Sequence, residues 1–174
     1  VTKDGKADVK GLTGKKSHTP KFIKTLFYEL LDILSAVQNE DEFANAKKQI
    51  TEKISEYAKK IQEKKIPLPE LAFNVMISKA PSEYVKTVPQ HIRAAKQLEA
   101  IREIKKGDII SYVKIINKPG VKPVEMAKPD EVDSSKYMEF MERTLEQITS
   151  SMDLDFDTIL GKPKQTGLDQ FFWN

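Results

Sequence analysis

TPKFIKTLFYELLDILSAV occupies residues 19–37, and QNEDEFANAKKQITEKISEYAKKI follows it directly at residues 38–61. In both segments apolar residues recur at spacings of three and four, which predicts two helices with one apolar stripe each. Because the link between them is short and polar, we expect the helices to pack as an antiparallel hairpin. The stripes are Phe22, Ile23, Leu26, Phe27, Leu30, Leu34 and Val37, then Phe43, Ala46, Ile50, Ile54, Tyr57 and Ile61.

Both predicted helices carry start signals. Thr19 offers a capping hydroxyl, and Pro20 is expected to occupy the first helical position. Asn39 is expected to start the second helix, with Glu42 as its capping-box partner three residues on.

The rest of the chain has weaker patterns. PQHIRAAKQLEAIREI (89–104) predicts a helix with Ile92, Ala95, Leu98 and Ile101 or Arg102 on one side. IISYVKII (109–116) is rich in β-branched and aromatic residues and predicts a strand. For LAFNVMISK (71–79) helix and strand both remain open, and residues 117–131 predict a Pro-rich loop. A third long helix is expected from Asp133 to Met152, with Tyr137, Phe140, Met141, Leu145 and Ile148 on its apolar side.

These elements predict a mainly α fold with a small β element, an α+β class. We expect three parts: a lead-in at residues 1–18, one domain at 19–160, and a linker with an extended C-terminal tail at 161–174. Gly161 and Pro163 would end any helix before that tail.

Composition excludes several classes of protein. No apolar run approaches the roughly 20 residues that a membrane-spanning helix needs, and residues 1–11 lack the apolar core of a signal peptide. The chain contains no Cys, which excludes disulfides and thiolate zinc sites and favours a cytoplasmic setting. It also lacks an initiator Met, as expected of a fragment or a processed chain.

Charge is unevenly distributed along the sequence. Residues 1–24 carry seven Lys against two Asp, and residues 79–106 carry seven basic residues against three Glu. Residues 125–160 carry ten acidic residues against three basic ones. Two basic stretches and one acidic arm indicate a one-sided surface for a polyanion, and ordinary solvated charge is the alternative.

The C-terminal residues QTGLDQFFWN contain two Phe and the only Trp of the chain, although a chain terminus is usually polar. In a helical turn Leu168, Phe171 and Phe172 would form one apolar plug, with the Gln165 amide upstream for a polar pocket. Such a turn needs a partner's groove, although folding back on its own core is the alternative. The pattern resembles the PIP box, which binds a PCNA-type sliding clamp.

Four stretches resemble, in order, the thumb of archaeal family-B replicative DNA polymerases. They are KGLTGKKSHTPKFIK (10–24), IPLPELAFNVMISKAPSEY (66–84), VPQHIRAAKQL (88–98) and KKGDIISYVKI (105–115). Two features depart from the family pattern: Gln90 separates the Pro from His91, and Lys15-Lys16 stands where many relatives carry Arg.

The resemblance implies a thumb that wraps primer–template duplex as it leaves the active site. The expected DNA-binding residues are Lys15, Lys16, Ser17, Lys79, Tyr84, Lys86 and His91, with Arg93 and Lys96 on the following helix. Lys side chains bind phosphates without reading bases, as a polymerase requires. The alternatives are solvated charge for each lysine and a partly buried polar role for Tyr84 and His91.

The sequence predicts no catalytic residue and no metal site in this chain. The family's palm carboxylates, which hold two Mg²⁺ ions, are absent, so no cofactor is expected here and Mg²⁺ belongs to the palm. DLDFD (153–157) is interpreted as a solvated acidic turn, and His18 and His91 lie too far apart to indicate a zinc site.

The expected partners are primer–template DNA, a PCNA-type clamp and the palm-bearing polymerase polypeptide, in the nucleoid-associated cytoplasm. Whether this chain is itself part of an enzyme stays open at this stage. The alternative is a standalone helical adaptor that brings a partner protein to the clamp through the acidic helix at 133–152. A clamp-tethered nuclease is disfavoured because no acidic cluster falls in the predicted core.

Overall fold

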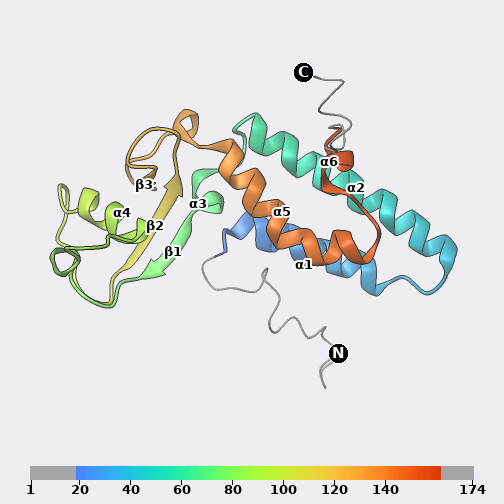
Figure 1. Cartoon of the computed structure of the whole chain (residues 1–174), viewed down its shortest axis with the longest axis horizontal. Helices are drawn as coiled ribbons and strands as arrows, with labels where there is room; N and C mark the ends of the chain where they lie inside the picture. Colours follow the sequence, from blue (N-terminus) through green and yellow to red (C-terminus); the bar gives the residue numbers. More distant parts are fainter. Residues whose placement is uncertain (1–18, 162–174) are drawn as a thin grey trace.

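The structure, a computed structural model, describes residues 19–161 (Figure 1). It is mainly helical, with one three-stranded antiparallel sheet, so the predicted fold class is confirmed. The predicted domain boundaries at 18 and 160 stay predictions. In chain order the elements are α1 (Lys21–Ser35), α2 (Glu40–Gln62), α3 (Leu68–Leu71), β1 (Phe73–Met76), η2 (Pro81–Glu83), α4 (Gln90–Leu98), β2 (Ile109–Lys114), β3 (Val121–Pro123), η3 (Pro129–Glu131), α5 (Ser134–Ser151) and α6 (Phe156–Ile159).

The molecule is elongated, with a helical body at one end and the sheet with α4 at the other (Figure 1). In the body α1 and α2 run antiparallel and α5 lies along both, as the hairpin prediction requires. The buried side chains of α1 are Phe22, Ile23, Leu26, Phe27 and Leu30, so the apolar stripe faces the core. Leu34 and Val37 are only half-buried because they lie where the hairpin ends.

Two details of the hairpin differ from the prediction. Pro20 is the N-cap residue of α1 rather than its first helical residue, so Thr19 does not occupy the N-cap position that was expected of it. Pro20 adopts φ −56° and ψ 144°, and its carbonyl accepts from the backbone N–H groups of Ile23 and Lys24. Phe43 is 38% exposed, because the first turn of α2 lies beyond the end of its neighbours, and Lys47 lies over its ring instead.

The start of α2 follows the predicted pairing of Asn39 with Glu42. The Asn39 side chain accepts from the Glu42 N–H at 2.8 Å. The Glu42 carboxylate reaches one residue further back and accepts from the Gln38 N–H at 2.7 Å. One free backbone donor in the first turn of α2 and one just before the helix are thereby satisfied.

The sheet has the strand order β1–β2–β3. For residues 71–79 the sequence left helix and strand open. They contain the last residue of α3 and strand β1, which pairs with β2 from Phe73↔Tyr112 to Met76↔Ile109. The Pro-rich segment at 117–131 was predicted as a loop only, but it also contains β3 and η3. Gly120, at φ +89°, turns the chain from β2 into β3, a conformation that glycine adopts readily.

Helix α4 is shorter than predicted, since it ends at Leu98 rather than near Ile104. Ile101 and Arg102, the two alternatives for its apolar side, are both exposed, Ile101 by 60%, whereas Ile104 is buried in an irregular segment. The chain must turn there to enter β2: Gly107, at φ +92°, donates to the Ile77 carbonyl at 2.9 Å. Pairing of the strands therefore overrides helix propensity in residues 99–104.

Tyr137 of α5 connects the helical body to the sheet. Its hydroxyl donates to the Leu71 carbonyl at 2.8 Å and accepts from the Lys114 backbone N–H at 3.0 Å. Its ring lies near those of Phe22 and Phe73, and burial raises the pKa of its phenol.

None of the helices at residues 19–161 combines the length and apolar character that crossing a bilayer requires.

Candidate nucleic-acid interface

Six of the predicted DNA-binding residues fall in one region of the structure, the loop between β1 and α4 and α4 itself. They are Lys79, Tyr84, Lys86, His91, Arg93 and Lys96. Lys15, Lys16 and Ser17 lie outside the described residues, as do the predicted clamp-binding residues Gln165, Leu168, Phe171 and Phe172.

Local sequence shapes this loop. The Glu83 carboxylate accepts from the Ala80 N–H at 2.8 Å, and the Tyr84 N–H donates to the Pro81 carbonyl at 3.2 Å. Together they close the single turn η2, which begins with Pro81. Pro89 then precedes α4, where its fixed φ suits a helix start. The conformation of the loop is therefore fixed by hydrogen bonds at η2 and by Pro89 before α4.

Tyr84 is the centre of this region. The Lys79 ammonium lies 4.6 Å from the centroid of its ring, and the Lys96 ammonium donates to its backbone carbonyl at 3.2 Å. Its hydroxyl lies 3.4 Å from that of Ser78. Tyr84 thus joins a lysine from the loop to a lysine from α4. We call Lys79, Tyr84, Lys86, Arg93 and Lys96 the tip cluster.

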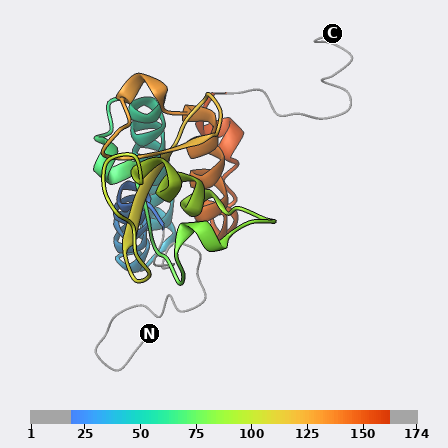
Figure 2. The same cartoon turned by 90° about the vertical axis from the view of Figure 1, so that its left-hand side faces the viewer.

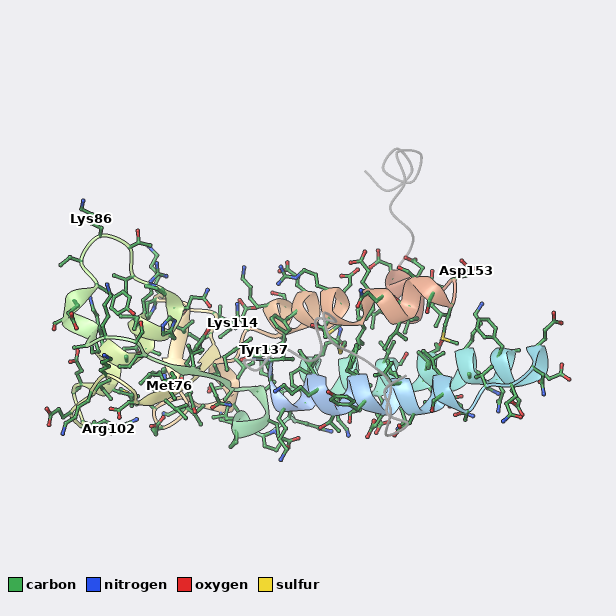
Figure 3. All side chains as sticks on the ribbon, turned by 90° about the horizontal axis from the view of Figure 1, so that it is seen from below. Met76, Lys86, Arg102, Lys114, Tyr137 and Asp153 are labelled. Carbon is green, nitrogen blue, oxygen red and sulfur yellow. The ribbon has the colours of Figure 1, made fainter. Side chains whose placement is uncertain are left out.

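The positive charges of the tip cluster are open to solvent. Lys79, Lys86, Arg93 and Lys96 are all exposed, and Figure 3 shows Lys86 projecting from the outer end of the loop. Within residues 19–161 no carboxylate lies within 4.0 Å of any of these four side chains. Their charge is therefore available to an external anion.

His91 differs from these cations. It is half-buried in the first turn of α4, and burial lowers the pKa of its imidazole below the usual 6.5. The ring is therefore neutral at pH 7 and would act as a hydrogen-bonding group rather than as a charge.

The acidic segment at 153–157 has a structural role. The Asp155 carboxylate accepts from the N–H and hydroxyl of Thr158 and so starts α6. Asp153 occupies a turn at φ 54° and is exposed, and Phe156 is buried. No group of three or more His, Asp or Glu side chains suited to a metal ion occurs between residues 19 and 161.

Comparison with known proteins identifies the family. The sequence model of DNA polymerase family B matches residues 1–158. The chain belongs to DNA polymerase family B. The predicted resemblance is thereby confirmed at the level of the family.

Named relatives agree with this assignment. The chain is 38% identical to DNA polymerase 1 of Saccharolobus solfataricus over 99% of its length, and 41% identical to DNA polymerase 1 of Sulfurisphaera ohwakuensis over 88%. It covers only 19% and 18% of those proteins, so it spans about a fifth of their length. The family B DNA polymerase of the archaeon Pyrobaculum calidifontis shares the fold, with a TM-score of 0.61 at 17% identity over 76% of this chain and 17% of that one.

Proposed function

We propose that this chain is the thumb part of a replicative family-B DNA polymerase and that it grips primer–template duplex without reading its sequence. The observation that supports this most is the tip cluster: four exposed cations without a carboxylate partner in residues 19–161, in a chain of this family. Membership of the family makes DNA the expected polyanion.

The chemistry of the tip cluster suits the phosphate backbone. Lysine and arginine bind phosphate oxygens and release counterions, which gives affinity that is independent of base sequence. Tyr84 contacts both Lys79 and Lys96 and keeps them close together. Two of the charges are therefore already positioned to bind phosphates of the same DNA strand. Lys15, Lys16 and Ser17 would add contacts at the entrance to the thumb.

The proposal assigns clamp binding to Gln165, Leu168, Phe171 and Phe172. Three apolar anchors at about 2 kcal/mol each give roughly 6 kcal/mol, and ordering the tail subtracts from this gain. Micromolar affinity for a PCNA-type clamp is therefore expected. A contact of that strength raises processivity because the thumb holds the same DNA.

Nucleotide incorporation is assigned to the palm-bearing part of the polymerase. Its carboxylates would hold the two Mg²⁺ ions that align the primer hydroxyl and the triphosphate. This chain would bind the duplex and attach the polymerase to the clamp during that reaction. None of its own residues is proposed to be catalytic.

The experiment is a titration of a short fluorescein-labelled duplex of mixed sequence with the full chain, followed by anisotropy at several salt concentrations. We expect binding at low salt that weakens steeply as salt rises. Lys86→Gln with Arg93→Gln removes two exposed charges and should lower the salt slope by about two. Lys48→Gln with Lys59→Gln on α2 removes the same charge outside the tip cluster and should change little. Absence of duplex binding by the unmodified chain at low salt would contradict the proposal.

A second candidate, an adaptor that carries a partner protein to the clamp, is favoured by one feature. A groove of about 410 Å³ lies between α5, α6 and the end of α2 and is lined by Met138, Glu139, Glu142, Phe156 and Asp157 among others. An acidic groove with apolar patches suits a basic peptide better than DNA. Capture of a protein that depends on Glu139 and Glu142, with no duplex affinity, would support the adaptor instead.

A further inference from the structure

A second group of cations meets where the sheet joins the helical body. Lys114 ends strand β2, and its carbonyl accepts from the backbone N–H of Asp133, the residue before α5, at 3.0 Å. Lys136 and Arg143 belong to α5, and after burial their charges also lower the pKa of Lys114. Figure 3 shows Lys114 beside Tyr137 at this junction. We call Lys114, Lys136 and Arg143 the junction cluster. Lys136 and Arg143 lie in the acidic stretch at 125–160, and the predicted DNA-binding residues included none of the three.

Two of the three cations in the junction cluster, Lys114 and Arg143, lie over aromatic rings rather than beside carboxylates. The Lys114 ammonium lies 5.3 Å from the centroid of Phe73. The Phe73 ring meets Phe140 edge to face at 5.3 Å, and the Arg143 guanidinium lies 5.9 Å from the Phe140 centroid. A ring face attracts a cation but does not neutralise it. The rings therefore position the charges and leave them able to bind an anion.

Within residues 19–161 no ion pair compensates the charges of the junction cluster. Burial, and then repulsion from Lys136 and Arg143, lower the pKa of Lys114, and Glu139 and Asp133 only partly oppose this. The Asp133 carboxylate accepts from the Lys136 N–H and the Ser135 hydroxyl at the start of α5. In the described part of the chain no carboxylate lies within 4.0 Å of Lys114, Lys136 or Arg143. A bound anion would relieve this repulsion.

We propose that the junction cluster is a second contact site for the phosphate backbone of duplex DNA, separate from the tip cluster. This inference rests on the proposed function of the chain. The loop that carries Lys86 projects on the side of the molecule where α5 lies, as Figures 2 and 3 agree. One duplex lying on that side would touch the loop at one end and Lys114, Lys136 and Arg143 at the other.

Duplex DNA is a better occupant than a small phosphate compound. The three cations come from a strand end and an exposed helix side, so they offer a surface rather than an enclosed pocket. Such a surface suits successive phosphates of a polyanion, whose binding gains from the release of many counterions.

The test compares two variants that lose the same charge. Lys136→Gln with Arg143→Gln changes two exposed side chains of α5, so the fold should persist. With the labelled duplex, its salt slope should fall by about two and its affinity at low salt should drop about tenfold. Lys48→Gln with Lys59→Gln is the matched control and should stay within about twofold of the unmodified chain.

A footprint on the unmodified chain gives an independent measurement. Brief acetylation with and without saturating duplex should show protection of Lys114 and Lys136, while Lys48 reacts equally in both samples. The inference is overturned if the unmodified chain binds duplex but the α5 variant matches the control, or if Lys114 and Lys136 stay fully reactive in the complex. Loss of all duplex binding by the unmodified chain would instead reject the proposed function itself.

Discussion

The hydroxyl of Tyr137 makes two hydrogen bonds that hold the sheet against the helical body, to the Leu71 carbonyl and the Lys114 N–H. Tyr137→Phe keeps the ring but leaves both backbone groups without this partner at a buried site. We expect a loss of about 1–3 kcal/mol in the free energy of unfolding, measured by urea denaturation with an unchanged m-value. Tyr28→Phe, at a side chain that is 43% exposed, is the control. Equal losses in both variants would contradict this role of the hydroxyl.

His91 gives a pH-dependent prediction. Burial lowers the pKa of its imidazole in the folded chain below the ordinary 6.5, so the unfolded chain binds the proton more readily. Its contribution to stability is therefore present above pH 6.5 and is lost as the pH falls through the lowered folded pKa. NMR titration of the imidazole protons should give a midpoint below 6.5, with His91→Gln assigning the signal between the two His of the chain. A midpoint at or above 6.5 would show that the site does not desolvate the ring.

At the scale of elements, periodicity was sufficient wherever an apolar pattern runs unbroken along an element that packs into the core. The stripe from Phe22 to Leu30 and the strand from Ile109 to Lys114 are where the patterns predict them. Periodicity failed where tertiary contacts decide. Ile101 continues the helical pattern of α4, yet the chain leaves the helix because Gly107 must reach Ile77 across the sheet.

The candidate site was predictable only in part, for the same reason. Lys79, Tyr84 and Lys96 come from motifs close together in sequence, so the family resemblance was enough to name them, although not to show that Tyr84 contacts both lysines. Lys114 and Arg143 are separated by β3 and η3 in the chain and come together only because the rings of Phe73 and Phe140, which carry them, meet where α5 reaches the sheet. The one sequence signal for the junction cluster was Lys114 at the end of a mostly apolar strand.

The loop between β1 and α4 depends on the Tyr84 ring for its shape. Tyr84→Ala removes the surface on which Lys79 lies, and a cation–π contact at an exposed site contributes about 0.5–1 kcal/mol. We expect faster amide hydrogen exchange across residues 77–89 and a duplex affinity about two- to fivefold lower. Tyr84→Phe keeps the ring and the carbonyl bonded by Lys96, so both measurements should match the unmodified chain. An identical response of the two variants would assign the effect to the hydroxyl.

At the scale of the whole molecule, the proposed contacts divide between two kinds of partner. The clusters at the tip and the junction would bind DNA weakly and through many charges, whereas the predicted tail anchors would bind one protein groove. If a clamp encircles the DNA that the proposed thumb binds, the second contact becomes intramolecular. Modest affinities can then combine into persistent association, which is what processive synthesis needs.

This coupling can be measured on DNA with and without a loaded PCNA-type clamp. We expect the full chain to bind clamp-loaded DNA more tightly than bare duplex by a factor on the order of 10² or more, because the tether supplies a high effective concentration. Phe171→Ala with Phe172→Ala should abolish that enhancement and leave the affinity for bare duplex unchanged, since the proposed DNA contacts lie elsewhere. Gln170→Ala, between the anchors, is the control and should keep the enhancement. Full enhancement in the double Phe variant would place the clamp contact on another part of the chain, and a loss of bare duplex affinity would mean that the tail also binds DNA.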